Sequence, residues 1–197
     1  MRVALTVFAF GLMSVPMGCS KRATVQSPSQ PQLRNTPGAG PTNGVDACSL
    51  LTSADIESVQ GVAVKATKPS LNSQGGVTVS QCYFLLPTAA DSIVLTVTQK
   101  SGGADARDPK EAWSEIFRSA KEAGSAPAEQ EKEKQSAPPQ QISDLGDEAF
   151  WAPQRFGGAL YVLKSDIYIS LSIGGPADQA TKLQKSKVLA EMVLKRL

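Results

Sequence analysis

The sequence predicts an α+β fold in which an antiparallel β-sheet is flanked by helices. Strand-like runs rich in β-branched and aromatic residues occur at 81–86, 93–97 and 159–173. Helical segments separate and follow these runs, but strand and helix do not alternate regularly, as they do in a parallel sheet. Residues 46–197 have the size of one ordinary domain, so we expect a single globular unit there.

The first helix is predicted near the start of this domain. Thr52 and Asp55 have the spacing of a capping box, in which each side chain accepts from a free backbone N–H group. Ile56 supplies an apolar position, and Gly61 is a typical helix end. A short strand is then expected over 62–64.

A second helix is predicted from Asp108, which is followed by Pro109 and Glu111, a favourable order for a helix start. The low-complexity segment 124–141, with its alternating Glu and Lys, is expected to be a solvated loop. Apolar residues of the helix recur at i, i+3, i+4 and i+7 and should face the core: Trp113, Ile116, Phe117 and Ala120.

A hairpin is predicted from strands at 159–163 and 167–173. In its second strand the apolar residues occupy every other position and share a buried face. Tyr168, Ser170 and Ser172 share the opposite face. A C-terminal helix follows, with apolar residues Leu183, Leu189, Met192, Val193 and Leu197.

The N-terminus has the order of a secretory signal peptide. Residues 3–15 form an uncharged run that is too short to span a bilayer as a helix. Residues 15–20 (VPMGCS) resemble the lipobox of bacterial lipoproteins, although Pro16 stands where leucine is usual. The resemblance implies a signal peptide over 1–18 and a lipid on Cys19. Secretion without a lipid is the alternative.

On this interpretation the protein is exported and anchored in the membrane of the cell envelope by its lipid. Ser20 would direct it to the outer membrane of a Gram-negative cell. Residues 19–45 are rich in Pro, Gly, Ser and Gln and contain few apolar residues, so a lipidated, disordered tether is expected. The 20 Lys+Arg against 18 Asp+Glu give no indication of a nucleic-acid partner.

Two cysteines remain within the predicted domain, Cys48 and Cys82. In an exported protein each has only the other as a partner, so we expect them to form a disulfide. Their separation excludes a CxxC redox pair.

An ordered series of short motifs resembles bacterial lipoproteins of the DUF3558 type and the related LpqN-like lipoproteins. The resemblance implies a fold like that of the Mog1/PsbP group and a location in the envelope, and it implies no established enzyme activity. The motifs are ACSLLT at 47–52 with Ala54-Asp55, SQCY at 80–83, LGDEAFW at 145–151, LYV at 160–162 and Leu189-Ala190.

Few residues suit catalysis. The chain has no histidine, which excludes Ser-His-Asp and Cys-His chemistry and histidine-ligated metals. Asp147 and Glu148 are adjacent, so on a strand they point to opposite faces and cannot act as a paired acid and base. Asp147 is expected to stabilise a turn, and a Ca²⁺ site with Asp144 and Asp166 is the less favoured alternative. We expect no cofactor, no metal and no catalytic residue.

The aromatic residues near the predicted hairpin form a candidate binding surface, extended by Thr96 and Thr98. Ordinary packing beneath a helix is the alternative. The surface comprises Trp151, Phe156, Tyr161 and Tyr168.

These observations favour a non-catalytic, lipid-anchored envelope protein whose globular part binds another envelope component. A second hypothesis is a carrier of a small ligand, with a pocket between sheet and helices lined by Trp113, Trp151 and Tyr161. A third is an enzyme that depends on carboxylates such as Asp147.

Overall fold

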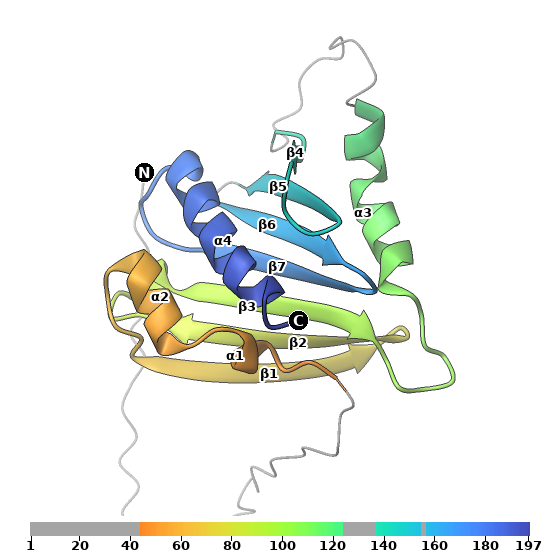
Figure 1. Ribbon diagram of the computed structural model, residues 1–197, viewed down its shortest axis with the longest axis horizontal. Coiled ribbons are helices and arrows are strands. Elements are labelled where there is room, and N and C mark those ends of the chain that lie inside the picture. The colour runs from red at the N-terminus through yellow and green to blue at the C-terminus, as the bar shows by residue number, and fades with distance from the viewer. Residues whose placement is uncertain (1–43, 124–136, 155–156) are drawn as a thin grey trace, which may run out of the picture. The chain divides into compact units, whose positions relative to one another are not determined.

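The computed structural model describes residues 44–123, 137–154 and 157–197. These residues form one seven-stranded sheet in the order β1-β2-β3-β7-β6-β5-β4, in which every neighbouring pair is antiparallel (Figure 1). The α+β class is therefore confirmed. The strands are β1 (Ala66–Gln74), β2 (Val77–Leu85), β3 (Ile93–Lys100), β4 (Gln140–Ile142), β5 (Glu148–Gln154), β6 (Gly157–Lys164) and β7 (Ile167–Ile173).

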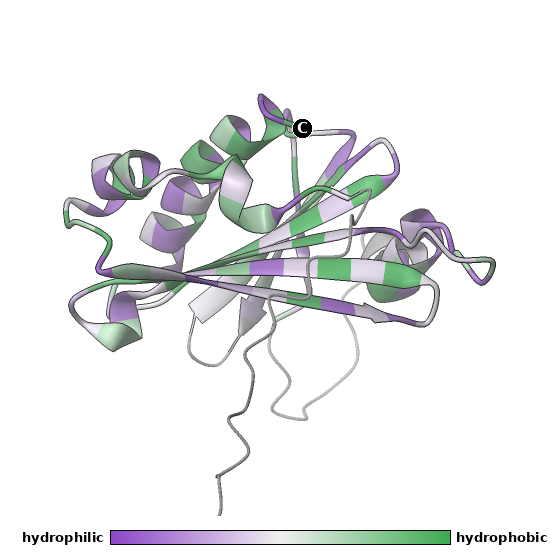
Figure 2. Ribbon diagram, turned by 90° about the horizontal axis from the view of Figure 1, so that it is seen from below, coloured by the Kyte–Doolittle hydropathy of each residue, from purple (hydrophilic) through white to green (hydrophobic). Residues whose placement is uncertain are grey.

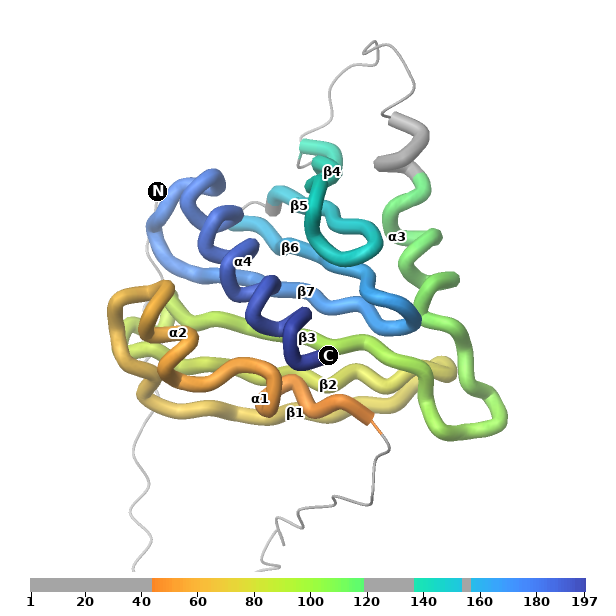
Figure 3. Tube along the Cα trace, in the orientation of Figure 1, coloured from red at the N-terminus to blue at the C-terminus, as the bar shows by residue number. Residues whose placement is uncertain are grey.

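Three of the four α-helices in this part of the chain lie on one side of the sheet. They are α1 (Ala47–Leu50), α2 (Ser53–Gln60) and α4 (Gln179–Leu194) (Figure 2). The C-terminal end of α4 lies beside α1, although the two are far apart in sequence (Figure 3). The fourth helix, α3 (Pro109–Ala123), packs near the opposite face at β7 and β3.

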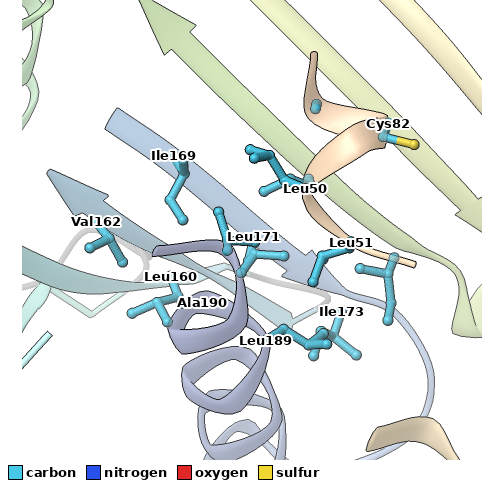
Figure 4. Close-up of a cluster of buried hydrophobic side chains, with 14 of the residues drawn as sticks. Leu50, Leu51, Cys82, Leu160, Val162, Ile169, Leu171, Ile173, Leu189 and Ala190 are labelled. Carbon is cyan, nitrogen blue, oxygen red and sulfur yellow. The ribbon is translucent and has the colours of Figure 1, made fainter. Parts of the chain in front are cut away.

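The main core lies between the sheet and α1, α2 and α4. Alternate residues of the central strands, such as Leu95 and Leu171, are fully buried on this side. Leu189 and Ala190 of α4 pack against them (Figure 4). The alternation predicted for 167–173 is confirmed, because Ile169, Leu171 and Ile173 are buried and the residues between them are partly exposed.

The helix predicted at Thr52 is confirmed as α2. Thr52 Oγ1 accepts from the backbone N–H of Asp55 at 3.1 Å, and Asp55 Oδ2 accepts from the backbone N–H of Thr52 at 2.7 Å. Gly61 ends the helix with φ 76°, a left-handed conformation that glycine adopts without a steric penalty. Both hydrogen bonds of the predicted capping box are therefore present at the start of α2.

The strand predicted over 62–64 is wrong. Residues 62–64 form no strand, and the chain instead enters β1 at Ala66. All nine residues of β1 are exposed, and each is paired with a residue of β2. Backbone pairing with β2, rather than burial of its own side chains, holds this segment in the sheet.

The helix predicted from Asp108 is confirmed as α3, and Asp108 Oδ1 accepts from the backbone N–H of Lys110 at 2.9 Å. Trp113 and Phe117 are buried as expected, whereas Ile116 is 46% exposed and does not belong to the core. The side chain of Ala120 lies outside the described part of the chain. The apolar face of α3 is therefore narrower than its spacing predicted.

The predicted loop 124–141 is partly wrong. Residues 124–136 lie outside the described part of the chain. Gln140 and Gln141 belong to β4, where they pair with Trp151 and Phe150 of β5. Pairing with a strand that is itself buried thus orders the end of a segment whose composition is that of a loop.

The sulfur atoms of Cys48 and Cys82 lie at disulfide-bond distance, 2.06 Å, as expected. The bond joins α1 to β2 across a sequence separation of 34 residues. Ala47 of the same helix donates its backbone N–H to Ser80 Oγ at 3.0 Å. These two links attach a helix of only four residues to the sheet.

An ion pair joins the C-terminal end of the chain to α2. Arg196 contacts both carboxylate oxygens of Asp55, at 2.7 and 3.2 Å, and also donates to the carbonyl of Leu50 at 2.7 Å. The Arg196 guanidinium, together with hydrogen bonds from Thr52, holds the pKa of the Asp55 carboxyl well below its usual range. Asp55 therefore caps α2 and attaches the end of the chain to it.

This arrangement predicts a loss of stability in acid. Because the Asp55 pKa is lower in the folded than in the unfolded protein, its contribution is present above about pH 4 and is lost as the pH falls below that value. Urea unfolding at several pH values measures this effect. Below about pH 4 the free energy of unfolding should fall less steeply with decreasing pH for Asp55→Asn than for the wild type. Asp166→Asn, in an exposed turn, should retain the wild-type slope, and an unchanged slope in Asp55→Asn would contradict the assignment.

Candidate functional site: the open face of the sheet

In the part of the chain that the structure describes, one face of the sheet is covered by a helix only at one end, where α3 packs. Side chains on this face are partly exposed, in alternation with the buried residues beneath α1 and α4. Figure 2 shows the same alternation of hydrophobic and hydrophilic residues along the strands. We call this surface the open face. It is formed by Val79, Gln81 and Tyr83 of β2, Val94 and Thr96 of β3, and Ser170 and Ser172 of β7.

The strand register brings the polar residues of the open face together. Thr96 lies opposite both Gln81 and Ser170. Tyr83 donates its hydroxyl to Gln81 Oε1 at 3.1 Å, and Gln81 Nε2 donates to Thr96 Oγ1 at 3.2 Å. This chain of hydrogen bonds holds neutral side chains in fixed positions on a surface that contains no carboxylate.

An aromatic cluster borders the open face where α3 packs. Phe117 of α3 stacks on Phe150 with ring centroids 4.6 Å apart. It also packs edge-to-face with Tyr161, with ring centroids 5.2 Å apart. Trp113 lies 5.8 Å from Tyr168 between ring centroids. Trp113, Phe117 and Phe150 are buried, while the two tyrosines are partly exposed and packed against them. Burial raises the pKa of Tyr161 above its ordinary value, and Tyr168 adds to this effect.

Of the four residues predicted to form a binding surface, the structure brings two together. Tyr161 and Tyr168 lie on the same side of the sheet as the open face, and Tyr168 lies opposite Thr98. Trp151 lies on the other side, 3% exposed, within the core beneath α4. Phe156 lies outside the described residues.

Trp151 fits into the core because Gly158 of β6, two residues from its register partner Leu160, has no side chain. Its indole lies over Gly158, where a Cβ atom would overlap the ring. Trp113 and Tyr161 belong to the aromatic cluster on the opposite side. The structure therefore separates the three residues expected to line a common pocket, and ordinary packing accounts for Trp151.

Asp147 has the contacts of a turn residue. Its Oδ2 accepts from the backbone N–H of Ser165 at 2.6 Å, and its Oδ1 lies 3.7 Å from Lys164 Nζ. Its own backbone N–H donates to the carbonyl of Leu163 at 2.8 Å. Glu148 instead accepts from Trp113 Nε1 at 2.9 Å. Among the residues that the structure describes, no three Cys, Asp or Glu side chains gather as a metal site would require.

Thr96 and Thr98 were predicted from the sequence as part of the binding surface, whereas Tyr83 and Gln81 were not. Both occupy alternate positions of the run at 81–86, which was interpreted as a strand without assigning its two faces. The register with β3 is what places them beside Thr96. Gln81 and Tyr83 alternate with the apolar Cys82 and Phe84, and this alternation was the available indication, whereas at 77–80 the polar residues Thr78 and Ser80 are the buried ones.

Comparison with known proteins adds no assignment: no family model, no curated protein and no solved structure matches this chain. Within the described ranges, no helix combines the length and apolar character needed to cross a bilayer.

Proposed function

We propose that this chain is a non-catalytic, lipid-anchored protein of the cell envelope whose globular domain binds another envelope protein through the open face. The observation that carries the binding proposal is the open face itself. It presents Tyr83, Gln81 and Thr96 in one hydrogen-bonded row on a sheet whose other side is covered by helices. Partly exposed tyrosine and neutral polar groups are well suited to a protein interface.

A photo-crosslinking experiment in cells tests the binding proposal. Benzoylphenylalanine placed at Tyr83 in the full-length protein should capture a discrete partner. The same group at Gln184, exposed on α4, should not. Adding a charge to the open face by Ser172→Lys should reduce the yield from position 83. Identical products from positions 83 and 184, or an unchanged yield with Ser172→Lys, would reject the open face as the interface.

The proposed anchor rests on the lipobox-like residues 15–20 and is tested separately. Cys19→Ser should move the protein from the detergent phase to the aqueous phase in a phase-partition assay, because the acyl chains supply the membrane affinity. Cys48→Ala provides the matched control, since that cysteine is joined to Cys82. Unchanged partitioning of Cys19→Ser would remove the lipid anchor from the proposal.

We also propose that the domain is of the Mog1/PsbP type found in DUF3558 and LpqN-like lipoproteins. The motif residues occupy positions that shape the fold, which supports the proposal. Cys48 and Cys82 join α1 to β2, and the turn at Gly146-Asp147 leads into β5. An experimental structure with a different strand order would contradict it.

A further inference from the structure

A pocket of about 390 Å³ lies away from the open face, between the C-terminal end of α2, the end of β7 and α4. Its wall also includes the short 3-10 helix η1 (Ala89–Asp91). Its volume is in the lower part of the range for small-molecule sites, which suits one small ligand and not an extended chain. Much of its lining is apolar and comes from Val62, Leu86, Ile173 and Pro176.

Two opposite charges line this pocket without pairing. Asp91 comes from η1 and Lys185 from α4, and no ion pair joins them. Lys185 Nζ donates to Gln60 Oε1 at 2.7 Å. An ammonium group has three donors, so this contact holds Lys185 in place and leaves it able to bind an anionic group.

The carboxylate of Asp91 lacks a hydrogen bond on one side. Its Oδ1 is buried and has no hydrogen-bond partner. Gly175 allows this position, because a Cβ atom there would lie 2.6 Å from that oxygen. A buried carboxylate oxygen without a donor is costly, and an ammonium group in the pocket beside Asp91 supplies the opposite charge that lowers this cost, without having to reach Oδ1 itself.

We propose that this pocket binds a small zwitterion with an apolar body, of the α-amino acid class. The ligand's ammonium group donates to Asp91, its carboxylate accepts from Lys185, and its side chain lies against Val62, Leu86 and Ile173. Each charge of the ligand thus meets the opposite charge of the wall. The site is separate from the open face, so the proposal holds or fails independently of the partner-binding function.

Calorimetric titration of the full-length protein with L-leucine tests this proposal. Leucine should bind, and isoamylamine and 4-methylpentanoate, which lack its carboxylate and its ammonium respectively, should bind at least about tenfold more weakly. Asp91→Asn and Lys185→Met should each weaken leucine binding by a similar factor. Lys195→Met and Asp105→Asn, at exposed positions outside the pocket, should leave it unchanged.

Thermal unfolding of each variant shows whether it is folded before titration, and Lys185→Met tests the site independently if Asp91→Asn is not. Failure of leucine to bind the folded wild-type protein at millimolar concentration would overturn the proposal. Equal binding of leucine and its two analogues would also overturn it, because the paired charges would then have no role.

Discussion

Trp113→Ala should lower the free energy of unfolding by about 3–5 kcal/mol, the range for removing a large buried aromatic side chain. Trp113 is 1% exposed and lies 4.5 Å from Phe117 and 5.9 Å from Phe150 between ring centroids. Its loss would leave a cavity between α3 and the sheet and remove a hydrogen bond to Glu148. Urea unfolding monitored by circular dichroism measures the difference.

Two further variants separate the contributions to this loss. Trp113→Phe keeps a ring in the cluster but removes the donor to Glu148, so it should cost about 1–2 kcal/mol. Ile116→Ala, on the exposed side of the same helix, should cost less than about 0.5 kcal/mol. If Trp113→Ala were no more destabilising than Ile116→Ala, α3 would not be packed on the sheet in solution.

The elements that the sequence predicted well are those that bury their own side chains. The strand at 167–173 alternates apolar and polar residues, and its buried and exposed faces follow that alternation. The capping box of α2 is a local interaction within four residues, so its spacing was sufficient to predict it. The cysteine pair followed from the absence of other partners.

β1 could not be predicted in the same way. Its sequence, ATKPSLNSQ, has neither alternation nor a β-branched run, and Pro69 argues against a strand in the middle of a sheet. Its place at the sheet edge makes that proline acceptable, because an edge strand does not need every N–H for pairing. What holds β1 is its register with β2, which is a tertiary property.

The candidate site shows the same limit. The polar face of 167–173 was recognisable, but which residues of other strands join it depends on β7 pairing with β3 across a long sequence separation. The separation of Trp113 and Trp151 onto opposite sides depends on that topology as well. The Asp91 pocket combines residues from α2, η1 and α4 that share no motif.

Loss of the Cys48–Cys82 bond should destabilise the domain by about 3–4 kcal/mol. A crosslink that closes a loop of 34 residues restricts the unfolded chain by this amount on the loop-entropy model. The double variant Cys48→Ala/Cys82→Ala should match the reduced wild type in urea unfolding and should not respond to a reductant. A wild-type protein whose unfolding is unaffected by the reductant would contradict the pairing of these two cysteines.

Reduction should also release α1 before the sheet opens. A helix of four residues has no stability of its own, so α1 depends on its attachments. Without the disulfide, those that remain include the hydrogen bond from Ala47 to Ser80, the bond from Arg196 to the Leu50 carbonyl, and the burial of Leu50. Hydrogen exchange at the Ser49 amide should therefore accelerate on reduction while amides at the centre of β3 stay protected. Equal acceleration in α1 and β3 would show instead that the bond stabilises the domain only as a whole.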